Sequence, residues 1–76
     1  MTRAEYDHYY KILEPHIGKT EIVGHAYPDV LLTLLGTENY EEGVNEWPRA
    51  LFKSSDGRDA DLELSVTIDL LHRGNQ

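Results

Sequence analysis

The chain has 76 residues, 39% of them hydrophobic, and its 14 acidic and seven basic residues give a formal net charge of −7. This length predicts a single small domain over residues 1–76 and excludes a two-domain enzyme. The absence of cysteine excludes disulfides and thiolate zinc sites, and the negative charge disfavours direct binding to nucleic acid or anionic lipid.

The first predicted element is a helix over residues 3–14, with room for one further turn as far as Gly18. Thr2 and Glu5 have the spacing of a capping box, in which each side chain bonds the other's backbone N–H. Pro15 then disfavours helical backbone at the residue before it. Aromatic and aliphatic side chains recur at three- and four-residue steps, which predicts a buried face more than a platform for stacking bases. They are Tyr6, Tyr9, Tyr10, Leu13 and Ile17.

The next segment predicts a short strand over residues 20–26, in which Gly24 marks either a bulge or a close approach of backbone. A short, largely buried helix is predicted over residues 28–36, because Pro28 suits a first helical position and Asp29 an acidic first turn. A run of valine and leucine follows, and Gly36 ends it.

The second half of the chain predicts a strand at 49–53, a turn at 54–57 and a long strand at 61–71. In that last segment Leu62, Leu64, Val66, Ile68 and Leu70 alternate with polar residues, as in a half-buried strand. Residues 68–73 alone could instead form a terminal helical turn, and residues 74–76 are expected to fray.

These elements predict an α+β fold, in which an N-terminal helix packs on a small antiparallel β-sheet accompanied by a short second helix. The sheet would be centred on residues 61–71, and the side of the first helix that carries Tyr6, Tyr10 and Leu13 would face it. No apolar run is long enough to span a bilayer, and no signal peptide is recognisable. We therefore expect a cytoplasmic protein. A homodimer that buries an exposed face would add to so small a core.

The charge is unevenly distributed along the chain. Residues 20–48 contain six acidic residues and no lysine or arginine, whereas the flanking segments are nearly balanced. The acidic stretch is densest over residues 37–47, whose secondary structure the sequence leaves open as helix, strand or loop. The predicted partner-binding residues lie there: Glu38, Tyr40, Glu41, Glu42, Glu46 and Trp47.

An acidic patch of this kind attracts basic protein surfaces, including those that bind phosphate groups. Tyr40 and Trp47 add aromatic side chains of the type that carry much of the binding energy at interfaces. The alternative is that the acidic patch only keeps a small protein soluble, which is the commonest role of a charged face.

Catalytic and metal-binding patterns are weak. Ser54, Ser55, Asp56 and His72 supply the residue types of a hydrolase triad without the glycine pattern around the serine. Glu5 and His8 have the spacing of a carboxylate-bridged metal helix, but the chain has no second copy of the motif. His16 and His25 lack zinc-ligand spacing. The sequence therefore predicts no catalytic residues, no metal site and no cofactor.

In size, acidity and absence of catalytic motifs the chain is similar to the small inhibitors that bacteriophages and mobile elements use against host nucleases. These include anti-CRISPR and anti-restriction proteins, some of which imitate DNA. The resemblance lies in composition alone, so it carries over no functional residue. It implies a non-enzymatic inhibitor that blocks a basic nucleic-acid-binding surface. The alternative is an accessory or regulatory domain that docks through its aromatic helix or a sheet edge.

Overall fold

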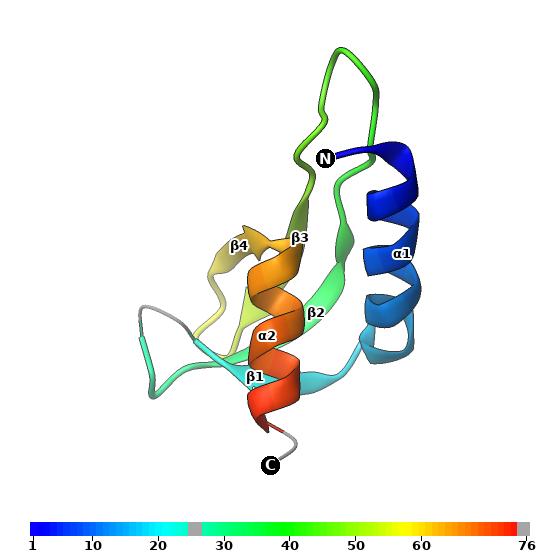
Figure 1. The fold of residues 1–76 in the computed structure, drawn as a ribbon. Helices are drawn as coiled ribbons and strands as arrows, with labels where there is room; N and C mark the ends of the chain where they lie inside the picture. The colour runs from blue at the N-terminus through cyan, green and yellow to red at the C-terminus, as the bar shows by residue number, and fades with distance from the viewer. Residues whose placement is uncertain (25–26, 75–76) are drawn as a thin grey trace.

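The structure is a computed structural model that describes residues 1–24 and 27–74. In chain order it contains α1 (Arg3–Leu13), the 3₁₀ turn η1 (Glu14–His16), β1 (Thr20–Val23), β2 (Leu31–Thr37), β3 (Arg49–Ser54), β4 (Asp59–Glu63) and α2 (Leu64–Gly74). The four strands form one antiparallel sheet in the order β1-β2-β3-β4. Both helices lie over the same face of this sheet (Figure 1). The predicted α+β class, an N-terminal helix with a small antiparallel sheet and a short second helix, is confirmed.

Helix α1 begins as its sequence predicts. The Thr2 hydroxyl accepts from the Glu5 amide at 3.2 Å, and the Glu5 carboxylate accepts from the Thr2 amide at 3.0 Å, which completes the capping box. The α-helix ends at Leu13, and Pro15 lies in the η1 turn that follows. Tyr6 and Leu13 are buried and Tyr10 is half-buried, so the predicted face of α1 does point into the core.

The predicted helix at 28–36 is wrong, because most of that segment forms the inner strand β2. Leu32 and Leu34 are buried while Leu31 and Leu35 are exposed, which is the period-2 pattern of a strand. Leucine favours helix locally, but pairing with β1 on one side and β3 on the other overrides that preference. The sheet is therefore centred on β2 and β3, and not on residues 61–71.

The predicted strand at 61–71 is wrong beyond Glu63, where α2 begins. The alternating pattern misleads because Thr67, counted as polar, is fully buried. Its hydroxyl donates to the Glu63 carbonyl one helical turn earlier, at 2.9 Å. With Thr67 included, Leu64, Thr67 and Leu71 form a helical stripe that packs on the sheet. Residues 75–76, part of the predicted frayed end, lie outside the described residues, and Gly74 is helical.

The remaining strand predictions agree with the structure. The strand predicted at 49–53 is β3, and the predicted turn at 54–57 joins it to β4. The strand predicted at 20–26 is β1 over 20–23, while residues 25 and 26 lie outside the described residues. Gly24 does mark a close approach of backbone, since a Cβ there would lie 2.6 Å from the Tyr27 carbonyl oxygen.

Candidate partner-binding loop

The predicted partner-binding residues lie in the connection between β2 and β3, residues 38–48, which we call the acidic loop. It extends beyond both helices at the end of the molecule where the N-terminus lies (Figure 1). The predicted set is thus brought together on one projecting segment. Whether residues 37–47 were helix, strand or loop could not be read from the sequence, and the structure makes nearly all of them loop.

The tip of the acidic loop is a tight turn closed by backbone hydrogen bonds. The Glu41 N–H donates to the Asn45 carbonyl at 2.9 Å, and the Asn45 N–H donates back to the Glu41 carbonyl at 2.7 Å. Gly43 lies inside this turn with a φ of +79°, a backbone conformation that glycine adopts without strain. The tip is therefore ordered by its own backbone.

Tyr40 fixes the base of the acidic loop. Its ring stacks on Tyr6 of α1 with 5.9 Å between ring centroids, and its hydroxyl donates to the Met1 carbonyl at 3.3 Å. The Arg3 guanidinium lies 6.0 Å from the centre of the Tyr40 ring, and its Nη1 donates to the Tyr40 carbonyl at 3.4 Å. Only 9% of Tyr40 is exposed. The structure therefore assigns Tyr40 to support of the loop, because its ring is not available as a contact.

The environment of Tyr40 also affects its ionisation. Burial raises the pKa of the Tyr40 hydroxyl above its ordinary value of 10.0, and the nearby Glu46 and Glu42 carboxylates raise it further. Arg3 acts in the opposite direction with a smaller effect. The phenol is therefore neutral at physiological pH, as its hydrogen bond to Met1 requires.

Glu38 is partly used by the structure as well. Its carboxylate accepts from the Arg49 N–H at 2.9 Å, and its own N–H donates to the Arg49 carbonyl at 2.9 Å. These two bonds join the two ends of the acidic loop where it leaves the sheet. Glu38 is exposed, but its carboxylate is already engaged by the backbone of β3.

Glu41, Glu42 and Glu46 are exposed and carry the free charge of the acidic loop. Within the described ranges 1–24 and 27–74, none of them forms an ion pair. The basic residues that do form ion pairs with acids do so elsewhere: Arg3 with Asp7, Arg49 with Asp61, Lys53 with Asp59, Arg58 with Asp56 and Arg73 with Asp69. Within these ranges, no basic side chain therefore neutralises the charge of these three carboxylates by direct contact.

Two apolar side chains accompany these carboxylates. Trp47 is 73% exposed and Val44, at the tip, is 77% exposed. Trp47 also borders a hollow of about 210 Å³ that α1 and the start of α2 help to line, through Tyr9 and Leu64. Sequence reasoning selected Trp47 and missed Val44. The signal that could have found Val44 is Gly43, which marks a turn tip beside it.

The residue types of a hydrolase triad do not form a free reactive group. The Ser54 hydroxyl bonds both the Asp56 carboxylate and the Arg58 backbone, so it closes the turn between β3 and β4. The hydrogen bond from the Ser54 hydroxyl is the main reason that the pKa of the Asp56 carboxyl lies below its ordinary value of 3.8. Ser55 and His72 are exposed on the surface.

The histidine and metal patterns are also accounted for by ordinary contacts where the structure describes them. The Glu5 carboxylate belongs to the capping box, and His16 Nδ1 lies 2.5 Å from the Glu21 carboxylate. His25 lies outside the described residues. No group of three acidic or histidine side chains that could hold a metal ion occurs in the part of the chain that the structure describes. In the same residues, no helix has the length and apolar character needed to cross a bilayer.

Comparison with known protein families, with curated proteins and with solved structures finds no match for this chain.

Proposed function

We propose that this protein is a non-enzymatic, cytoplasmic protein-binding protein whose acidic loop occupies a basic, nucleic-acid-binding surface of another protein and blocks it. The observation that carries this proposal is the coincidence, on one projecting and anchored loop, of three carboxylates that form no ion pair with the described residues and two exposed apolar side chains. They are Glu41, Glu42, Glu46, Val44 and Trp47. A surface that only served solubility would need the charges but not the exposed indole.

The anchoring of the loop supports this function energetically. Binding costs free energy for every flexible side chain and loop that must be ordered, so a loop that is already held in place loses less on association. Here the Tyr6 ring, the Arg3 guanidinium and the Met1 carbonyl hold the base of the loop through Tyr40. The unpaired carboxylates would speed encounter with a basic partner, and Trp47 would retain it.

A phage-type counter-defence protein, such as an anti-CRISPR or anti-restriction inhibitor that imitates DNA, is the specific form of this proposal. Its support is the small size and acidity of the chain, together with a protruding loop (Figure 1) whose sequence contains exposed glutamates. A protein of this kind would compete with DNA for one surface of its partner. An accessory domain that docks through an aromatic helix has less support, because Tyr6 is buried and Tyr9 and Tyr10 are half-buried.

The test is a capture experiment with matched variants. Immobilised wild-type protein is compared with the double variant Glu41→Lys, Glu42→Lys in extracts of the source cell. The control is Glu14→Lys, Asp29→Lys, which makes the same change in net charge at two exposed positions away from the loop. We expect wild type and control to retain a nucleic-acid-binding protein that the loop variant does not retain.

A second step tests the blocking activity itself. Duplex DNA added to the captured complex should release the partner from the wild-type protein, and the wild-type protein should in turn inhibit DNA binding by the purified partner. If all three forms retain the same proteins, or if DNA and this protein bind the partner together, the proposed function is wrong.

A further inference from the structure

The outer edge of β4 has unused backbone hydrogen-bonding groups. β4 is the last strand in the sheet, and no strand among the described residues pairs with its far side. The Ser54 N–H donates to the Arg58 carbonyl at 2.8 Å where β3 and β4 meet. Hydrogen-bonded and non-hydrogen-bonded residue pairs alternate along an antiparallel ladder. The next pair, Lys53 with Asp59, is therefore not hydrogen-bonded, and the backbone N–H and C=O groups of its two residues point away from each other. The N–H and C=O of Asp59, and by the same alternation those of Asp61, therefore face outward.

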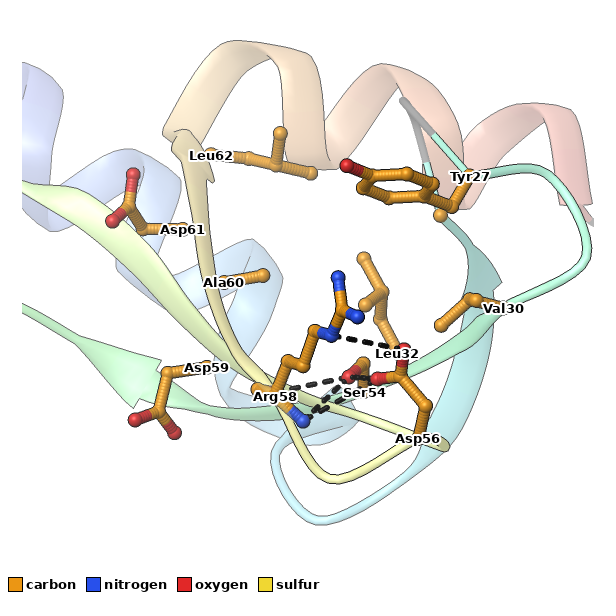
Figure 2. Close-up of a pocket in the computed structure, with 11 residues that line it drawn as sticks. Tyr27, Val30, Leu32, Ser54, Asp56, Arg58, Asp59, Ala60, Asp61 and Leu62 are labelled. Atoms are coloured by element: carbon orange, nitrogen blue, oxygen red, sulfur yellow. Dashed lines mark hydrogen bonds and ion pairs between the residues drawn. The ribbon is translucent and has the colours of Figure 1, made fainter.

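The side chains of β4 separate by chemistry across the two faces of the sheet. Asp59, Asp61 and Glu63 are exposed on the face away from the helices, whereas Ala60 and Leu62 are half-buried on the helix side. Figure 2 shows this alternation, with Asp59 and Asp61 directed away from the pocket and Ala60 and Leu62 toward it. One side of the free edge is thus acidic and the other is apolar.

The pocket beside this edge is an apolar hollow of about 200 Å³. Its apolar walls come from β2, from β4 and from the residues that precede β2, namely Val30, Leu32, Ala60, Leu62 and Tyr27 (Figure 2). The polar residues at its border, Ser54, Asp56 and Arg58, bond one another in the β3–β4 turn. Pockets for whole small molecules usually measure about 300–1,000 Å³, so this one fits a single side chain better.

We propose that the outer edge of β4 binds an extended segment of a partner protein in which basic residues alternate with apolar ones. The segment would add a fifth, antiparallel strand. Its lysine or arginine side chains would lie opposite Asp59 and Asp61, and an apolar side chain between them would enter the hollow beside Ala60 and Leu62. This surface is separate from the acidic loop, and the inference does not depend on the function proposed for that loop.

The acidic side chains of β4, Asp59, Asp61 and Glu63, determine which kind of segment can pair with this edge. A second copy of the chain paired through its own β4 would place aspartate and glutamate opposite aspartate and glutamate, which destabilises a strand pair. A basic segment reverses the sign of that interaction. Asp61 and Asp59 already contact Arg49 and Lys53, at 2.5 Å and 3.1 Å, but these are exposed ion pairs, which contribute little and exchange readily. The Asp61 carbonyl accepts from Arg49 Nη2 at 3.4 Å and retains a second lone pair.

The test uses a capped peptide of about eight residues in which lysine and valine alternate, a length typical of strands. It is titrated into ¹⁵N-labelled protein. We expect amide shifts at Asp59 to Leu62 and at Tyr27, with slower hydrogen exchange at the Asp59 and Asp61 amides. A peptide with glutamate in place of lysine should bind at least about tenfold more weakly.

Backbone methylation of the peptide provides the matched control. In the proposed pairing the residues opposite Asp59 and Asp61 are the lysines, and their N–H groups donate to β4. Methylation of the lysine backbone nitrogens should therefore abolish binding, whereas methylation of the valine nitrogens should be tolerated. The variant Asp59→Lys, Asp61→Lys should prefer the glutamate peptide, and the peptide comparison stands even if that variant does not fold. Equal effects of the two methylations, shifts confined to residues 38–47, or no shifts at all would overturn the proposal.

Discussion

Tyr6 and Tyr40, 34 positions apart in the sequence, stack with 5.9 Å between their ring centroids and so fasten the acidic loop to the first helix. The Tyr6 hydroxyl lies 2.9 Å from the hydroxyl of Thr37, the last residue of β2, and donates to the carbonyl of Glu38, the first residue of the loop, at 3.2 Å. A single buried side chain of α1 thus supports both the core and the candidate binding surface.

Tyr6→Ala should lower the free energy of unfolding by about 3–5 kcal/mol, the usual cost of removing a buried aromatic ring. Tyr6→Phe keeps the ring and loses only the hydroxyl contacts, so it should cost about 1 kcal/mol. Trp47→Ala removes an exposed side chain and should change stability by less than about 0.5 kcal/mol. Urea denaturation of the three variants measures these differences. A cost for Trp47→Ala as large as that for Tyr6→Ala would contradict the assignment of Tyr6 to the core and Trp47 to the surface.

The raised pKa of Tyr40 predicts a loss of stability in alkali. Because burial and the neighbouring carboxylates disfavour the phenolate in the folded protein, the phenol ionises more readily once the chain unfolds. The stabilising contribution is therefore complete below pH 10.0, the ordinary value, and is lost as the pH rises through the folded-state pKa. Urea denaturation over a pH series that crosses 10.0 should show a steeper decline for wild type than for Tyr40→Phe. Parallel curves would show that Tyr40 titrates alike in both states.

The burial of Thr67 distinguishes the helix α2 from a strand through residues 61–71. Leu64→Ala should cost about 2–5 kcal/mol, since Leu64, the first residue of α2, is fully buried. Thr67→Ala should cost about 1–3 kcal/mol, because it removes a buried methyl group and a hydrogen-bonded hydroxyl. Glu63→Ala, at an exposed position, should be much milder. A strand through 61–71 would instead make Thr67→Ala as mild as Glu63→Ala, so chemical denaturation distinguishes the two arrangements.

Replacement of Gly24 and of Gly43 by alanine should destabilise the protein by different amounts and for different reasons. A Cβ at position 24 would meet the Tyr27 and Val30 carbonyl oxygens at 2.6 Å and 3.0 Å, so Gly24→Ala must displace backbone and should cost about 1–3 kcal/mol or more. At position 43 there is open space, and Gly43→Ala meets only the strain of a positive φ, about 1–2 kcal/mol. Thermal unfolding, with the loop amides followed by NMR, should show that Gly43→Ala perturbs the loop tip and Gly24→Ala the sheet.

Features that depend on neighbouring residues in the sequence were predicted well. The capping box at Thr2 and Glu5 and the turn at 54–57 are local, and both occur as expected. The errors arose where distant contacts decide the outcome. The leucines of 31–35 could serve a helix or a strand, and pairing with β1 and β3 selects the strand. The alternation at 61–71 broke down because packing of α2 against the sheet and α1 buries Thr67, which the pattern counted as exposed.

In the candidate site, too, the features that depend on the local sequence were predicted and those that depend on distant contacts were not. The acidic character of residues 38–46 follows from counting charges, which requires no secondary structure. The burial of Tyr40 could not be predicted, because it depends on Tyr6 and on the Met1 carbonyl, both far away in the chain. Val44 was missed because a lone valine among polar residues has no periodicity, and only the turn at Gly43 places it at the tip.

The most direct test of the central claim is the association rate of the captured partner with wild-type protein, with Glu41→Lys, Glu42→Lys and with the control Glu14→Lys, Asp29→Lys, measured over a series of salt concentrations. Contact through the acidic loop predicts that the wild-type and control rates fall together as salt screens the attraction, with a Debye length of about 8 Å at physiological ionic strength. The loop variant should associate slowly at every salt concentration, and Trp47→Ala should mainly accelerate dissociation. Affinity that is unchanged by both the loop reversal and the salt series would show that the acidic loop is only a solubilising surface.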